Sequence, residues 1–141
     1  MSRRRPHRIG ALAGAAAALA LAPAACGGSS GDLMSIDVSG GAARRSQRIV
    51  VQDNGQATCN GGPLTDIGSS ALIEARDLER ELKDPAEDAR TFPSATPGAA
   101  GATYVARTND GTVRWQETAR GLPPVLPRVV LFALQQGRKL C

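Results

Sequence analysis

The feature that most constrains this chain is an uninterrupted apolar stretch near its start, Ile9–Ala22. Four arginines and no acidic residue precede the stretch, and small residues followed by Cys26 come after it. At about 1.5 Å of rise per residue, a helix of this stretch reaches about 21 Å, which is short of a hydrocarbon core about 30 Å thick. A membrane-spanning helix is therefore disfavoured, and the folded body must be built from the residues that follow.

The order of a basic segment, an apolar segment and small residues before a cysteine resembles a bacterial lipoprotein signal peptide. In that family the peptide is cut just before the cysteine, so the resemblance implies that Cys26 is lipidated and anchors the protein to the extracytoplasmic face of the cell membrane. Pro23 stands where the family normally has leucine. An ordinary secretory signal cut near Ala25 is the alternative. Residues 2–5 also resemble the start of a twin-arginine signal, which leaves the export route open.

Loss of residues 1–25 changes the charge of the protein. The chain has 17 basic and 13 acidic residues, and four of the basic ones but none of the acidic ones lie in that segment, so the remainder has a net charge of 13 minus 13, or zero. The basic excess that suggests nucleic-acid binding thus belongs to the leader, and we exclude that function.

The single histidine, His7, lies in the same leader. The remainder therefore has no imidazole for a Ser-His-Asp or Cys-His pair or for a zinc site. We predict that the protein is not an enzyme and that it uses no cofactor and no metal.

The remaining 116 residues, 141 minus 25, suit one domain. Residues 26–32, the lipidated cysteine and a Gly/Ser-rich run, are predicted to form a short flexible tether that holds the domain close to the membrane. We place the single domain at residues 33–141.

Alternating apolar residues and turn sequences predict a first strand and two hairpins. The first strand begins at Leu33 and ends at Gly40-Gly41. One hairpin pairs residues 48–52 with 56–59, and the other pairs 103–108 with 112–117. Their turns, Asp53-Asn54-Gly55 and Asn109-Asp110-Gly111, superficially resemble calcium loops, but they lack the later oxygen ligands and the closing glutamate, so we interpret both as turns.

Two helices complete the predicted fold. Ser69 or Ser70 can cap a helix that runs through Lys83, where Asp84-Pro85 stops it. A second helix runs from Pro127 to Gln136 and ends at Gly137; it is apolar nearly all round, which predicts burial against the sheet or in a partner interface. Residues 85–102 are predicted to be the least ordered internal segment. The fold class is α+β, a small domain with a mainly antiparallel sheet of two hairpins packed against two helices.

Two pairs of residues are predicted to hold this fold together. Tyr104 and Trp115 are the bulky members of the second hairpin and should nucleate the core, with an aromatic binding platform as the alternative. Cys59 and Cys141 remain once Cys26 is assigned to lipid, and an even pair in an exported domain predicts a disulfide. If Cys26 is not lipidated, the odd count leaves a reactive thiol or an intermolecular bridge.

The order of elements is similar to that of emfourin-type protealysin inhibitors. Residues 36–41, Ile-Asp-Val-Ser-Gly-Gly, match the opening strand of that family, and Tyr104-Val105 with Asp110-Gly111 matches its hairpin. Residues 122–126, Leu-Pro-Pro-Val-Leu, match the start of its last helix. The resemblance implies a tight inhibitor of thermolysin-like metalloproteases. The lipid anchor, the segment Arg44-Arg45 and the cysteine pair are departures from the family pattern.

Three functions follow from these features. The favoured one is a membrane-anchored binding or accessory lipoprotein of the cell envelope that performs no catalysis and has an envelope protein as its partner. The alternatives are a metalloprotease inhibitor and an enzyme that needs no histidine. The expected partner contact is the first glycine loop with the basic edge beside it: Ser39, Gly40, Gly41, Arg44, Arg45 and Arg48.

Overall fold

The structure is a computed structural model that describes residues 31–41 and 46–141. Its elements are β1 (Asp32–Gly40), β2 (Gln47–Gln52), β3 (Gln56–Cys59), β4 (Thr65–Asp66), α1 (Ser69–Glu87), β5 (Thr91–Phe92), β6 (Ala102–Thr108), β7 (Gly111–Gln116) and α2 (Val125–Leu140). The predicted signal peptide and Cys26 lie outside the described residues, as do Arg44 and Arg45.

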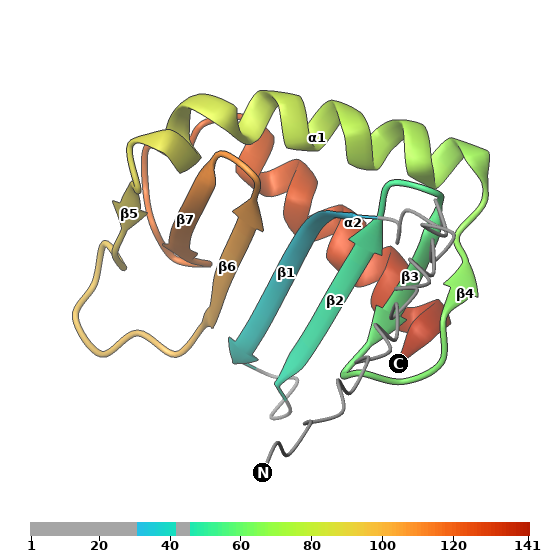
Figure 1. The fold of residues 1–141 in the computed structure, drawn as a ribbon. Helices are drawn as coiled ribbons and strands as arrows, with labels where there is room; N and C mark the ends of the chain where they lie inside the picture. The colour runs from blue at the N-terminus through green and yellow to red at the C-terminus, as the bar shows by residue number, and fades with distance from the viewer. Residues whose placement is uncertain (1–30, 42–45) are drawn as a thin grey trace, which may run out of the picture.

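The strands of the described residues form one sheet in the order β4-β3-β2-β1-β6-β7-β5 (Figure 1). Both predicted hairpins are confirmed, and they flank the first strand, which is therefore the central strand of the sheet. Neighbouring strands are antiparallel except β5 and β7, which run parallel. The predicted α+β class with a mainly antiparallel sheet is confirmed.

The core lies between one face of the sheet and the two helices (Figure 1). In β1, Met34, Ile36 and Val38 are buried on this face because successive side chains of a strand point to opposite sides. Tyr104 and Trp115 belong to the same cluster, exposed by 4% and 1%, and their rings stack with centroids 5.4 Å apart. Both are core residues, as predicted.

Helix α1 differs from the prediction at both ends. Gly68 occupies the N-cap, and no side chain caps the helix, so the predicted serine cap is wrong. The helix also continues past Asp84-Pro85 to Glu87, with Pro85 inside its last turn. Pro85 is buried, and its carbonyl accepts a hydrogen bond from the N–H of Arg90 at 3.0 Å. Burial of the ring in the core therefore outweighs the one helical hydrogen bond that proline cannot donate.

Helix α2 is longer than predicted and has one exposed side. It begins at Val125 and runs through Gly137 to Leu140, so the prediction that Gly137 ends it is wrong. Gly137 is buried against β2, where the nearest atom to an added Cβ would be Oε1 of Gln47, at 3.2 Å. Leu131 and Leu134 are 57% and 51% exposed, which corrects the expectation of burial all round.

The segment predicted to be least ordered, residues 85–102, holds more structure than expected. It contains the last turn of α1, and Thr91–Phe92 form β5, which pairs with β7. The Oγ of Ser94 lies 2.7 Å from Oγ1 of Thr118, which ties the intervening loop to the residues after β7. Residues 93–101 are in neither helix nor strand, so the irregular part is shorter than predicted.

Candidate binding groove

The predicted contact loop lies at the end of the central strand. Ser39 and Gly40 are exposed, and Gly40 and Gly41 have φ angles of 76° and 67°, values that side chains disfavour. A Cβ on Gly41 would also lie 3.0 Å from the backbone nitrogen of Ala102. The two glycines therefore let the chain turn sharply against the start of β6.

Arg48 does not join this loop but lies on the open face of the sheet. Its Nε is 3.7 Å from Oδ1 of Asp37, and Arg107 forms an ion pair with the other oxygen of the same carboxylate. Arg48 is therefore one of two arginines around a carboxylate on the central strand. Sequence reasoning missed Arg107 because its contact with Asp37 depends on the pairing of β1 with β6, which joins residues far apart in the chain.

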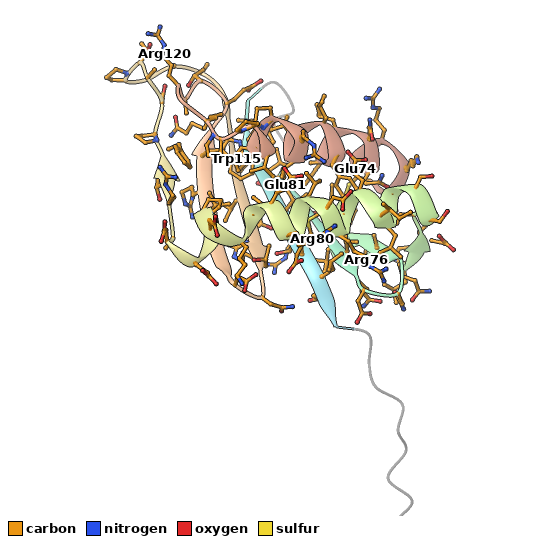
Figure 2. All side chains as sticks on the ribbon, turned by 90° about the horizontal axis from the view of Figure 1, so that it is seen from above. Glu74, Arg76, Arg80, Glu81, Trp115 and Arg120 are labelled. Carbon is orange, nitrogen blue, oxygen red and sulfur yellow. A yellow bond between two sulfur atoms is a disulfide. The ribbon has the colours of Figure 1, made fainter. Side chains whose placement is uncertain are left out.

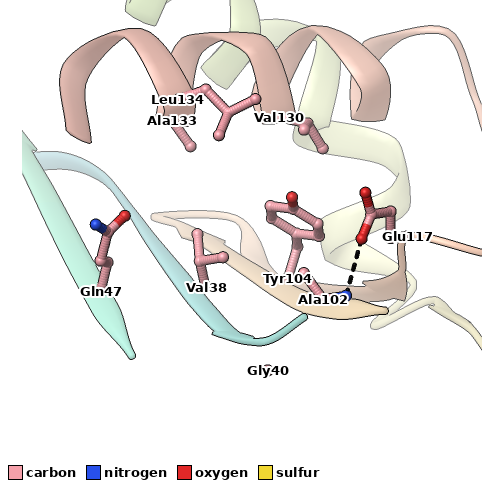
Figure 3. A pocket seen from close by; sticks show the side chains of 9 residues that line it. All are labelled: Val38, Gly40, Gln47, Ala102, Tyr104, Glu117, Val130, Ala133 and Leu134. Atoms are coloured by element: carbon pink, nitrogen blue, oxygen red, sulfur yellow. Dashed lines mark hydrogen bonds between the residues drawn. The ribbon is translucent and has the colours of Figure 1, made fainter. Parts of the chain in front are cut away.

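A cavity of about 240 Å³ opens on the other side of the loop, between the sheet and α2 (Figure 3). Strand residues form its floor and α2 forms its roof. The lining residues are Val38, Gly40, Gln47, Ala102, Tyr104, Glu117, Val130, Ala133 and Leu134. Gly40 is the member of the predicted loop that reaches this cavity, and the surface is largely apolar.

One carboxylate stands in this apolar wall. Oε2 of Glu117 accepts a hydrogen bond from the N–H of Ala102 at 3.0 Å, which holds the side chain at the edge of the cavity (Figure 3). Burial raises the pKa of the Tyr104 hydroxyl, and the negative charge of Glu117 raises it further. A tyrosine hydroxyl is protonated at neutral pH in any case, so Tyr104 can donate a hydrogen bond to a ligand, and the raised pKa extends this ability to more alkaline solution.

A second hollow of about 350 Å³ continues from the first along α2. The two share Glu117 and Val130, and the second adds Trp115, Leu122, Pro127 and Leu131. Nε1 of Trp115 is buried and has no hydrogen-bond partner within the described residues. We call the two hollows together the α2 groove. Its apolar walls and single carboxylate suit an extended segment of another protein that carries apolar side chains and a basic group.

The sequence offered little that identifies this groove. The sequence singled out the glycine loop, of which Ser39 and Gly40 are exposed, but it did not single out Glu117, Val130 or Leu134. In the sequence, Glu117 stands at the end of the second predicted hairpin, and Val130 and Leu134 lie in the apolar last helix. Which side of that helix meets the sheet becomes visible only in the folded chain.

The two cysteines predicted to pair lie on β3 and directly after α2. They are joined in a disulfide with Cα atoms 5.5 Å apart, a usual spacing for such a bond. The bond closes a loop of 82 residues and fixes the end of α2 against the sheet edge. The disulfide fixes the C-terminal end of α2 to β3, a strand that does not line the α2 groove.

Comparison with known proteins identifies no relative of this chain. No protein family, curated protein or solved structure matches this chain. Neither α1 nor α2, the two helices of the described ranges, has the length and hydropathy needed to cross a membrane. In residues 31–41 and 46–141, no three His, Cys, Asp or Glu side chains are grouped as metal ligands.

Proposed function

We propose that the protein is a lipid-anchored, extracytoplasmic binding protein of the cell envelope, and that a partner protein docks without catalysis in the α2 groove. The observation that carries this proposal is the pair Leu131 and Leu134, which are more than half exposed beside two connected apolar hollows. Burying one such side chain is worth about 1.5–3 kcal/mol when it starts fully exposed, so a partner that covers both gains a useful part of its affinity here.

The partner is expected to be an envelope protein that presents an extended segment with two apolar side chains and a lysine or arginine. The apolar pair fits the two hollows, and the basic residue meets Glu117, which borders both of them. The exposed end of β1 at Ser39 and Gly40 completes the contact from the side of the sheet.

The test is capture of partners from detergent-solubilised envelope by the protein and by matched variants. Leu134→Ser should reduce the recovered partner roughly fivefold or more, since about 1 kcal/mol of apolar burial is lost. Ile73→Ser is the control, because Ile73 is 60% exposed on α1 and lines neither hollow of the groove. Recovery of the bait alone, or an equal loss with both variants, would contradict the proposal.

The anchor needs its own test, because Cys26 lies outside the described residues. Globomycin blocks cleavage of lipoprotein signal peptides, so treated cells that express the protein should accumulate an uncleaved form. A Cys26→Ser variant should be released from the membrane fraction. Normal processing under globomycin would show that the cysteine is not lipidated.

Inhibition of a thermolysin-like metalloprotease is the second candidate function. It is favoured by the observed order of elements: β1 ends at Gly40 and is followed by the β2–β3 pair, the short strand β4, helix α1, the short strand β5, the β6–β7 hairpin and the last helix, α2. The loop is exposed and free to enter a protease cleft at Ser39 and Gly40. Titration of such a protease with the purified, disulfide-intact protein should then abolish activity at one equivalent. Full activity at micromolar protein would remove this candidate.

A further inference from the structure

The two halves of α2 are held against the rest of the protein in different ways. The first half buries apolar side chains, namely Val125, Leu126, Val129, Phe132 and Ala133. Arg128 adds an ion pair, with its Nη1 2.5 Å from Oε1 of Glu81, and Glu81 lies on the side of α1 that faces α2 (Figure 2). Burial of apolar side chains therefore holds the first half of the helix in place.

The second half of α2 has weaker anchors. Its buried residues are Gln136 and Gly137. Oε1 of Gln136 has no hydrogen-bond partner within the described residues, and a buried acceptor without a partner disfavours the folded position. Glycine disfavours a helix, and Leu140 is only partly buried against the core. Packing alone therefore holds the end of this helix weakly.

The disulfide lies at this weakly held end. Cys141 follows α2 directly and is bonded to Cys59 on β3, with Cα atoms 5.5 Å apart. The N–H of Cys141 donates to the carbonyl of Gly137 at 3.0 Å, so the covalent bond is continuous with the last helical turn. Cys59 is 7% exposed, whereas Cys141 is classed among the exposed residues. A thiolate can therefore approach the bond from the side of Cys141.

The last turn of α2 contacts the α2 groove at two points. Gly137 packs beside Gln47, whose Oε1 would lie 3.2 Å from an added Cβ, and Gln47 lines the first hollow. Nε of Arg138 donates to the carbonyl oxygen of Leu134 at 3.3 Å, and Leu134 lines the same hollow. A movement of residues 136–140 therefore reaches the groove from the sheet side and from the helix side, although β3 itself does not line it.

We propose that the disulfide is a redox-sensitive clasp, which holds residues 136–140 in place and thereby keeps the α2 groove in its binding form. A dithiol reductant opens the clasp in two steps. One thiolate of the dithiol attacks Sγ of Cys141, the S–S bond breaks, and its electron pair leaves with Sγ of Cys59, which takes up a proton. The second thiolate of the dithiol then attacks the reductant's own sulfur in this mixed disulfide and releases Cys141 as a thiol. The dithiol becomes a disulfide, and the protein gains two electrons and two protons.

Opening of the clasp is expected to be local. The apolar side chains that anchor the first half of α2 do not depend on the disulfide, whereas the last turn loses its covalent tie to β3. The expected weakening of partner binding rests on the proposed function of the groove. Release of the last turn does not rest on that function and can be measured without a partner.

The first test uses NMR of the protein purified from expressing cells, before and after reduction with dithiothreitol. On reduction, the ¹³Cα shifts of residues 137–140 should move from helical toward random-coil values, while those of residues 126–132 stay helical. Gln136→Met replaces the unpaired buried acceptor by an apolar side chain and should keep the turn helical after reduction. Gln135→Met is the matched control, because Gln135 is exposed and its replacement should not rescue the turn.

The second test repeats the capture of partners from detergent-solubilised envelope. Without reductant, Cys59→Ala/Cys141→Ala should recover roughly threefold less partner than the unmodified protein, since a smaller fraction of its grooves is in the binding form. Dithiothreitol should lower recovery by the unmodified protein to the level of the double variant. Recovery by the double variant should not change with dithiothreitol, which separates the clasp from any disulfide of the partner.

Three results would overturn the proposal. Helical shifts that persist at residues 137–140 in the reduced protein would show that the disulfide does not hold the turn. Loss of native shifts throughout the sheet would show global unfolding instead of a local release. Equal recovery of partner by the unmodified protein and the double variant would show that the clasp does not control the groove. Recovery of the bait alone would contradict the proposed function of the groove, whereas the NMR comparison decides on the release of the turn.

Discussion

Gly111 and Ala86 are so close that a Cβ on the glycine would lie 2.3 Å from the carbonyl oxygen of the alanine. The turn between β6 and β7 therefore packs directly against the last turn of α1. Gly111→Ala must displace backbone on both sides and should lower the free energy of unfolding by about 3 kcal/mol or more. Urea unfolding followed by tryptophan fluorescence measures this loss.

Gly61→Ala is the matched control for that experiment. Gly61 also has a positive φ, of 71°, but no atom lies within 4 Å of an added Cβ. Its cost should be limited to backbone strain of about 1–2 kcal/mol. Equal losses for the two variants would mean that the contact with Ala86 contributes nothing beyond conformation.

Gly137→Ala is expected to act in the opposite direction. Glycine inside a helix is about 1 kcal/mol less favourable than alanine, and the nearest atom to an added Cβ is Oε1 of Gln47, the mobile end of a side chain, at 3.2 Å. The amide can move aside, so the free energy of unfolding should rise by up to about 1 kcal/mol. A higher urea midpoint for Gly137→Ala would verify this prediction, and a lower midpoint would show that the Gln47 side chain cannot be displaced.

Reduction of the disulfide between Cys59 and Cys141 should lower the free energy of unfolding by about 2–5 kcal/mol, because the unfolded chain regains the freedom of a long loop. The measurement compares urea midpoints with and without reductant. The double variant Cys59→Ala/Cys141→Ala should match the reduced protein and should no longer respond to reductant. A midpoint that ignores reductant in the unmodified protein would contradict this prediction.

We expect ionisation of Tyr104 to lower the free energy of unfolding in alkaline solution. Its pKa is raised above the ordinary tyrosine value of 10.0, first by burial and then by the charge of Glu117. Because the folded-state pKa is raised, protonated Tyr104 contributes its full stabilisation below pH 10. This contribution to the free energy of unfolding is lost as the pH rises through the folded-state pKa. The chain has one tyrosine, so the absorbance change near 295 nm on its ionisation can be assigned directly. Tyr104→Phe should remove this part of the alkaline loss, and an ordinary titration midpoint in the folded protein would contradict the shift.

Local chemistry made parts of the fold predictable from sequence. The turns at Asp53-Asn54-Gly55 and Asn109-Asp110-Gly111 follow from residues that favour tight hairpins, and both occur where expected. The helix ends were harder to predict. A proline or glycine favours the end of a helix locally, but burial of neighbouring side chains can extend the helix past it. Pro85 and Gly137 are both typical of helix ends, yet both are buried against the rest of the fold and lie inside helices.

The candidate site was less predictable because its residues meet only after folding. Ser39, Gly40 and Gly41 could be identified from a glycine pair at a strand end. The walls of the α2 groove could not, since Gln47, Glu117 and Leu134 come from three separate elements. The burial of Gln136 is likewise not evident from the sequence, where a glutamine on a helix suggests a solvated side chain.

The length of β1 separates the N-terminal end of the described domain from the α2 groove. The strand has nine residues and begins just after the predicted tether, so its far end at Gly40 lies on the order of 30 Å away. If the protein is anchored through Cys26, as proposed, the attached end of β1 and the end at Gly40 are opposite ends of the central strand. The central strand thus separates the end of the domain that follows the proposed anchor from the surface proposed to bind a partner.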